Sequence, residues 1–267
     1  MPPYTKHMKL YGQVAWFNFG TYLAYPLELF ASITKPSLEL GLRLVFWGIV
    51  AASSPGTIST RQVIAYFLIA TSLSNLFLLD SIRFGGWLAR GIKSGDISSD
   101  LLKPTDILTY NLAVVFGRQG VTYLVSLGFF VIGMIVAPPS GLLSIALFIT
   151  YIPIALGISY GINVLVGTVA FYFTEAGSIK NVVAHVSNIF SGALIPLVFF
   201  PGTLKTIAIL LPFSAAIYGP VQALHSTQVT NQMWLQLISG AVWSVVLVVV
   251  SNKAWRNGMK HYDAIGI

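Results

Sequence analysis

Cysteine is absent from the 267 residues of this chain, which excludes disulfide frameworks, thiolate metal sites and cysteine nucleophiles. Charge is scarce as well, because only 9% of the residues are Asp, Glu, Lys or Arg, against about 25% in soluble globular domains. Hydrophobic residues make up 55% of the chain and its mean hydropathy is +0.79. There are too few polar residues to cover a soluble globule, so we expect an all-α integral membrane protein.

Motifs for chemistry are also missing from the sequence. No G-x-x-x-x-G-K-[ST] loop occurs, nor even a Gly-Lys dipeptide, so the chain has no P-loop with which to hold ATP phosphates. The four histidines have no metal-like spacing. We therefore expect no catalytic, cofactor-binding or metal-binding residues in this chain, and no enzyme activity of its own.

The net charge of +7 would suggest a nucleic-acid partner in a soluble protein. Here the cations stand in short connections between apolar runs, as the positive-inside rule describes for membrane proteins. We therefore expect no nucleic-acid partner. On a model of six crossings, the external connections hold Arg61 and Lys205, whereas the cytoplasmic side holds ten cations: Lys6, Lys9, Arg83, Arg90, Lys93, Lys103, Lys180, Lys253, Arg256 and Lys260. This asymmetry places both termini in the cytoplasm.

Apolar runs of suitable length predict the crossings. Residues 1–28 carry lysines and aromatic residues and predict a helix in the headgroup layer, in contact with membrane lipid. The six expected transmembrane helices cover about 30–52, 63–79, 120–137, 142–174, a segment from about 182, and 234–252. Because 142–174 is longer than one straight span requires, we expect that helix to be kinked, tilted or extended beyond the bilayer. Its Gly157 and Gly161 allow close helix approach.

Residues 196–224 interrupt this pattern with four prolines: Pro196, Pro201, Pro212 and Pro220. If the apolar run from 206 to 224 crossed the membrane, the chain would make seven passes and its two basic termini would lie on opposite sides. An external re-entrant helical hairpin between helices five and six avoids this conflict. We therefore predict a re-entrant region at 196–224.

The first expected crossing carries three charges, Lys35, Glu39 and Arg43. Their i, i+4, i+8 spacing places them on one helix face with alternating sign. Ionised groups are costly in hydrocarbon, so this face should look into protein or water. Two interpretations remain open: Lys35 reaches the interface while Glu39 and Arg43 form a structural pair, or the three charges serve a substrate path or a contact between permeases.

The longest polar segment of the chain is 83–106. Ser94-Gly95 breaks the chain, Asp96 can serve as an N-cap, and 97–102 can form a short helix that Pro104 ends. Such a helix would have Ile97 and Leu101 on one face at i, i+4, beside Leu102. It could press these apolar side chains into a groove on a cytoplasmic partner. The alternative is a solvated loop whose leucines lie against the membrane.

Three stretches carry a family resemblance. The run from Arg90 to Pro104, Arg-Gly-Ile-Lys-Ser-Gly-Asp-Ile-Ser-Ser-Asp-Leu-Leu-Lys-Pro, resembles the cytoplasmic segment of bacterial type-2 ABC exporter permeases of the six-helix branch. That branch more often has arginine at the positions of Lys93 and Lys103. The tail from Trp255 to Gly266 is similar to the basic, aromatic terminus of the family, with Asn257 where another cation is usual. The prolines of 196–224 look like the family's external re-entrant region.

The resemblance implies a single transmembrane permease domain over 1–267, with an interfacial helix at 1–28, a coupling segment at 83–106 and a cytoplasmic tail at 253–267. It implies a multi-pass protein of the bacterial plasma (inner) membrane that exports an amphiphilic substrate. Its partners would be a second permease, identical or sibling, and two separate ATPase subunits, which would bind ATP and Mg. The residues expected to couple to the ATPase are Asp96, Ile97, Asp100, Leu101, Leu102, Lys103 and Pro104.

Two other classes of function stay open at this point. An ion-gradient carrier or channel would use Glu39, Asp80 and His185 and would work without an ATPase. A membrane assembly factor would recruit a soluble protein without transporting anything.

Overall fold

The computed structural model of the chain describes residues 3–53, 59–77, 82–103, 105–173, 176–260 and 262. Across these ranges the regular secondary structure consists of α-helices and two short 3-10 helices, with no strand. The expected all-α class is therefore confirmed for the described part of the chain. The helices are α1 (Pro3–Leu23), α2 (Pro26–Ser53), α3 (Thr60–Leu76), α4 (Arg83–Ser94), α5 (Ile97–Leu101), α6 (Ile107–Arg118), α7 (Gly120–Val136), α8 (Leu142–Thr168), η1 (Val169–Phe171), α9 (Ala176–Phe190), η2 (Leu197–Phe199), α10 (Gly202–Leu210), α11 (Pro212–Ala216), α12 (Tyr218–Leu224) and α13 (Asn231–Lys260).

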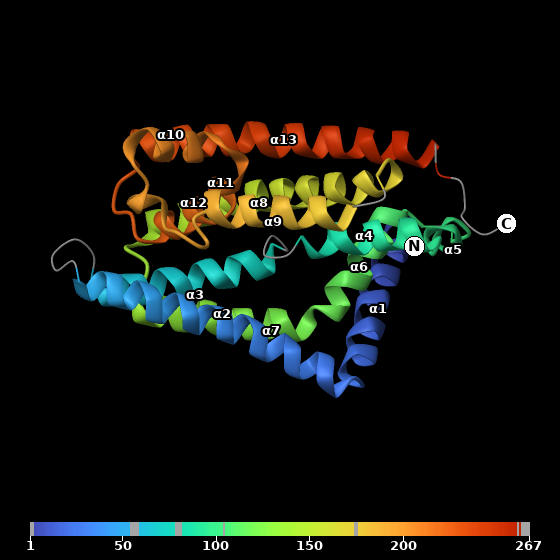
Figure 1. Ribbon diagram of the computed structural model, residues 1–267, viewed down its shortest axis with the longest axis horizontal. Coiled ribbons are helices and arrows are strands. Elements are labelled where there is room, and N and C mark those ends of the chain that lie inside the picture. Colours follow the sequence, from blue (N-terminus) through green and yellow to red (C-terminus); the bar gives the residue numbers. More distant parts are fainter. Residues whose placement is uncertain are drawn as a thin grey trace.

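Most of the long helices lie along one common axis. In Figure 1, α2, α3, α7, α8, α9 and α13 run roughly along the long axis of the molecule, while α1 stands across it at one end. The same end holds α4, α5 and the last turns of α13, and the opposite end holds α10, α11 and α12 (Figure 1). The polar segment and the proline-rich segment thus lie at opposite ends of the bundle.

Three described helices are long and apolar enough to cross a membrane: α2, α13, and α8 continued through η1 to Phe171. The pair α6 and α7 would make a fourth span, bent by 66°. These helices support an integral membrane protein. With 17 and 15 residues, α3 and α9 are shorter than the roughly 20 residues that a straight span takes. Six crossings therefore stay a prediction.

The α1 helix packs closely against the bend between α6 and α7. A side chain at Gly117 would meet the carbonyl of Ala15, and one at Gly120 would meet the ring of Phe19. The sequence correctly predicts the start of α7 at Gly120, but α6 was not expected. The sequence therefore did not predict the bent span that α6 and α7 form, or its contact with α1.

The α8 helix packs closely against α13 along the glycine pair expected from the sequence. A Cβ added at Gly161 would lie 2.6 Å from Leu247 Cβ, and one at Gly157 would collide with Ser244. From Leu142 to Phe171 the helix has 30 residues, or roughly 45 Å at 1.5 Å per residue. It is thus longer than a bilayer's hydrocarbon core of about 30 Å, as expected.

The proline-rich segment consists of short helices whose starts the prolines define. Pro196 and Pro201 immediately precede η2 and α10, Pro212 is the first residue of α11, and Pro220 lies in the first turn of α12. With nine residues, α10 is only about 14 Å long. Trp243 of α13 donates its indole N–H to the Leu210 carbonyl at 2.9 Å, which fixes the end of α10 against α13. The re-entrant arrangement itself stays a prediction.

Candidate functional site

The expected coupling segment is more ordered than a polar loop. Phe84, Leu88 and Ile92 recur at i, i+4 and i+8 along α4, and all three are buried in one apolar cluster with Trp255 of α13. The helix ends at Gly95, whose φ of 79° lies in the left-handed region that glycine favours. The polar residues of 83–94 thus form one face of a helix whose other face is core.

Ile97 belongs to that apolar cluster and is 2% exposed. It therefore anchors α5 to α4 and is not available to a partner in this conformation, in contrast to our expectation that it shares a contact face with Leu101. The exposed apolar side chains of 97–102 are Leu101 at the end of α5, 50% exposed, and Leu102 just after it, 88% exposed. Of the apolar residues expected to contact a partner, these two leucines are the exposed ones.

Asp96 occupies the N-cap position of α5 but does not cap the helix with its side chain. Its carboxylate accepts a hydrogen bond from Ser94 Oγ at 2.6 Å, and its backbone carbonyl accepts one from Ser99 Oγ at 2.7 Å. The expected start of the helix is right, while the expected capping chemistry is wrong. Pro104 lies outside the described residues.

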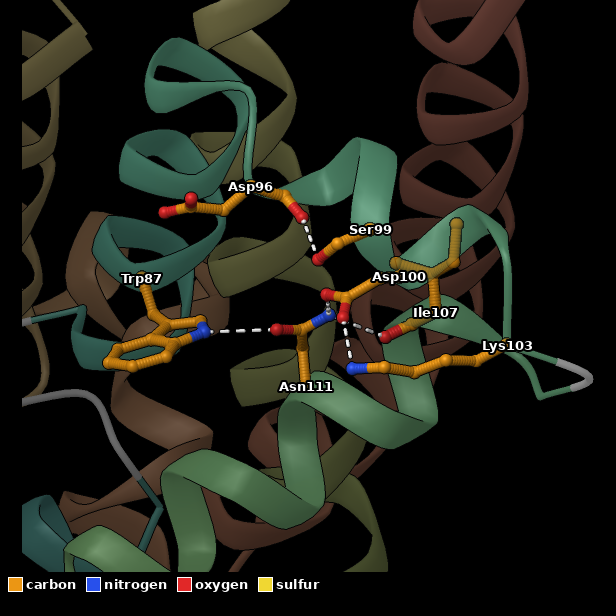
Figure 2. A network of polar contacts seen from close by, with 7 residues as sticks. All are labelled: Trp87, Asp96, Ser99, Asp100, Lys103, Ile107 and Asn111. Carbon is orange, nitrogen blue, oxygen red and sulfur yellow. Dashed lines mark hydrogen bonds and ion pairs between the residues drawn. The ribbon is translucent and has the colours of Figure 1, made fainter.

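A buried amide links the three helices of the segment (Figure 2). Asn111 of α6 accepts a hydrogen bond from the Trp87 indole N–H of α4 at 2.9 Å, and donates to Asp100 Oδ2 of α5 at 2.8 Å. Its second amide hydrogen reaches the Ile107 carbonyl at 3.0 Å. Asn111 is 5% exposed, so this network satisfies a polar group that would be costly to bury alone.

Asp100 also pairs with Lys103, whose Nζ lies 2.6 Å from Asp100 Oδ1. The ammonium group stands 4.0 Å from the centroid of the Tyr110 ring. Burial by itself lowers the pKa of Lys103, but its contacts with Asp100 and Tyr110 outweigh burial and raise that pKa above its usual value. Lys103 therefore stays charged near neutral pH, and Asp100 is held by Lys103, which follows α5, and by Asn111 of α6.

Two further features of this site were not expected from the sequence. The hydroxyls of Ser98 and Tyr262 lie 3.2 Å apart, which connects α5 with the C-terminal tail. The Trp87 ring has Arg118 at 4.7 Å and Arg90 at 5.9 Å from its centroid. Isolated Trp, Asn and Tyr residues carry no sequence signal for such contacts, although the aromatic and basic character of the tail was part of the family resemblance.

The charged face of α2 lies apart from this network. Lys35 Nζ lies 3.7 Å from Glu39 Oε1, while Arg43 donates to Thr71 Oγ1 of α3 at 3.0 Å. Glu39 thus pairs with Lys35, and the structural Glu39–Arg43 pair of one interpretation stays a prediction. Of the predicted site residues, the structure brings together those of 96–103, and leaves Glu39, Arg43 and the four prolines outside this group.

Comparison with protein families finds one match. A family model described as "ABC-2 family transporter protein" matches residues 40–266, which include the Trp87–Asn111–Asp100 network and the close contact of α8 with α13. No curated protein matches the chain significantly. Members of this family are generally non-catalytic membrane subunits that work with an ABC ATPase. The chain therefore belongs to the ABC-2 transporter family, as a multi-pass membrane permease subunit of an ABC transporter.

Proposed function

We propose that this permease is one half of an ATP-driven exporter, in which an amphiphilic substrate passes between two facing permeases, identical or sibling. Two separate ATPase subunits would bind ATP and Mg and drive transport. Membership of the ABC-2 family supports this proposal over an ion-gradient carrier using Glu39, Asp80 and His185, and over an assembly factor without transport.

The exposure of Leu101 and Leu102 carries the proposal for the ATPase contact. These leucines are 50% and 88% exposed on a short helix held by buried Ile97 and by the hydrogen bond between Asp100 and Asn111. A fixed backbone with two uncovered apolar side chains suits insertion into a groove. Burying one leucine completely contributes about 1.5–3 kcal/mol. We therefore propose that α5 docks in a groove of the ATPase, with Asp96, Asp100 and Lys103 around the contact.

We further propose that α2, α3, the α6–α7 pair, α8, α9 and α13 are the six crossings, with both termini in the cytoplasm of a bacterium and α10, α11 and α12 outside. The arrangement in Figure 1 supports this topology, because α4, α5, the start of α9 and the last turns of α13 lie at one end. Most of the cations assigned to the cytoplasm belong to these elements, and the positive-inside rule places such an end in the cytoplasm.

Co-purification with the cognate ABC ATPase tests the docking surface. We expect the double substitution Leu101→Asp, Leu102→Asp to abolish retention of the ATPase by the tagged permease, because two carboxylates would have to enter an apolar groove. The matched control is Leu142→Asp, Leu143→Asp, a leucine pair that is 84% and 48% exposed at the opposite end of the bundle. Equal retention by wild type and the α5 variant, or equal loss in both variants, would show that α5 is not the docking element.

A further inference from the structure

A basic cavity lies beside the coupling segment, on the side where α2 begins. Its volume is about 400 Å³, and residues of α1, α2, α4, α6, α7 and α9 line it. Among the residues that the structure describes, five of the chain's 15 Lys and Arg residues face this cavity, with a single carboxylate, that of Glu28. The five cations are Lys35, Arg83, Arg90, Arg118 and Lys180.

The arrangement of these cations is held by neighbouring groups. Arg118 and Arg90 contact the ring of Trp87, with their guanidinium carbons 4.7 Å and 5.9 Å from its centroid. Contact with the face of a ring engages the positive charge and leaves the N–H donors available. Arg83 is fixed by hydrogen bonds to Gln119 and, at 3.3 Å, to Asn75.

Lys180 reaches the cavity across α4 because residue 86 is glycine. A Cβ at Gly86 would lie 3.0 Å from Lys180 Cδ and 3.9 Å from its Nζ. Among the described residues, Arg90, Arg118 and Lys180 form no ion pair with a carboxylate. At these three residues the cavity therefore holds positive charge that no carboxylate in the described part of the chain pairs with.

Such a cluster matches a phosphate group better than a carboxylate. A phosphate presents several anionic oxygens, which accept hydrogen bonds from two guanidinium groups and an ammonium at once. A carboxylate has two oxygens and one negative charge, so it would satisfy fewer of these donors. Like charges gathered at a cavity raise its positive potential, which increases affinity for an anion of higher charge.

The exposed apolar face of α2 lies away from the cavity. Leu27, Phe30 and Ile33 are 84%, 67% and 44% exposed, and at 3.6 residues per turn they fall on the opposite side of the helix from Glu28, Ala31 and Lys35 of the cavity. The cavity itself therefore offers recognition of a phosphate group, which either a lipid headgroup or a free phosphate ion can present.

We propose that this cavity binds a phosphate group, with Arg90, Arg118 and Lys180 as its principal ligands. The site lies within the permease chain and does not depend on the docking of an ATPase. It adds a phosphate-binding site to the proposed function and assigns a role to Trp87, as the ring that positions both arginines.

Displacement of a fluorescent short-chain phosphatidic acid from the full-length permease in an uncharged detergent tests the proposal. We expect dioctanoyl phosphatidic acid to displace the probe, and dioctanoyl phosphatidylcholine, whose phosphate carries a positively charged choline, to be at least about tenfold weaker, since about 1.4 kcal/mol of lost interaction is a factor of ten. If phosphatidylcholine competes as well as phosphatidic acid, the cavity does not recognise an anionic phosphate group and the proposal is wrong. Sodium phosphate distinguishes the two sources of the group: equal competition identifies a free phosphate ion, and competition at least about tenfold weaker identifies a lipid headgroup.

The triple variant Arg90→Gln, Arg118→Gln, Lys180→Gln should raise the dissociation constant at least about tenfold, because charge-assisted hydrogen bonds are lost. The control Lys253→Gln, Arg256→Gln, Lys260→Gln removes the same charge from exposed positions of α13 and should change it less than about twofold. If both triple variants raise the dissociation constant equally, binding depends on the overall charge of the protein and not on the cavity. If the first variant leaves the dissociation constant unchanged, the cavity is not the binding site. If thermal unfolding shows that the triple variant is misfolded, Lys180→Gln alone decides, with weaker binding expected.

Discussion

The side-chain amide of Asn111 donates to Asp100 Oδ2 at 2.8 Å while its oxygen accepts the Trp87 indole N–H at 2.9 Å. One residue of α6 thereby joins α5 to α4. All the hydrogen-bonding groups of this amide face a partner, since its second hydrogen reaches the Ile107 carbonyl. A buried network that is fully satisfied favours one arrangement of its elements, because any other leaves a polar group without a partner.

Replacing Asp100 should therefore loosen α5. In Asp100→Ala, the Asn111 amide loses an acceptor and Lys103 loses its carboxylate, which should destabilise the segment by about 1–3 kcal/mol. We expect faster amide hydrogen exchange over residues 97–103. The control Asp96→Ala removes an exposed carboxylate that, within the described part of the chain, accepts a hydrogen bond only from Ser94 Oγ. If both variants exchange at the same rate, the network does not hold α5.

The contact between α8 and α13 should depend on the absence of a side chain at Gly161. A Cβ there would lie 2.6 Å from Leu247 Cβ and 2.8 Å from its carbonyl carbon, so Gly161→Ala must separate the helices and should cost about 1–3 kcal/mol, as overpacking does. Thermal unfolding in detergent measures the change.

Gly128 of α7 provides the matched control for that substitution. A Cβ at Gly128 would meet nothing within 4 Å, and alanine favours a helix over glycine by about 1 kcal/mol. Gly128→Ala should therefore leave the unfolding temperature unchanged or raise it. If Gly161→Ala and Gly128→Ala lower the unfolding temperature equally, close packing at Gly161 is not the cause of the decrease.

The sequence alone predicts those parts of the fold that depend on local pattern. Long uncharged runs predict α7, α8 and α13, because a membrane helix needs about 20 apolar residues. Ser94-Gly95 predicts the end of α4, since the backbone there adopts a positive φ that glycine accommodates. Gly157 and Gly161 predict the close approach of α8, although its partner, α13, could not be named.

What could not be predicted depends on contacts between distant residues. The stripe of Phe84, Leu88 and Ile92 has the spacing of a buried helix face, but the polar composition of 83–106 concealed it. Burial of Ile97 removes it from the expected contact face, and only the packing of α4 against α5 shows this. Asn111 has no motif around it, so its position between Trp87 and Asp100 had no signal in the sequence.

The Lys35–Glu39 pair should matter little for stability. Its atoms are 3.7 Å apart and the side chains are 50% and 32% exposed, so Glu39→Gln should change the free energy of unfolding by less than about 1 kcal/mol. We expect assembly with the ATPase and transport in vesicles to be unchanged as well. A loss of transport at unchanged stability would contradict this prediction and give Glu39 a role in the substrate path.

The absence of cysteine makes the six-crossing topology testable, because each introduced cysteine is unique. Ser140 and Thr203 are exposed, and the backbone N–H of Ser140 bonds to the Leu224 carbonyl at 3.0 Å, so 140 and the end of α12 lie together. We expect a membrane-impermeant maleimide to label Ser140→Cys and Thr203→Cys in intact cells. Ser94→Cys should react only after permeabilisation.

Labelling at these three positions tests two questions independently: the orientation of the chain in the membrane, and whether α9 crosses it. Ser140 follows the α6–α7 pair, so its labelling depends on the first three crossings alone. Thr203 lies two further segments along, after α8 and the 15-residue α9, which is only about 22 Å long. If Ser140→Cys is labelled from outside and Thr203→Cys is not, α9 does not cross. If Ser94→Cys alone is labelled in intact cells, the orientation is inverted and the positive-inside argument fails for this chain.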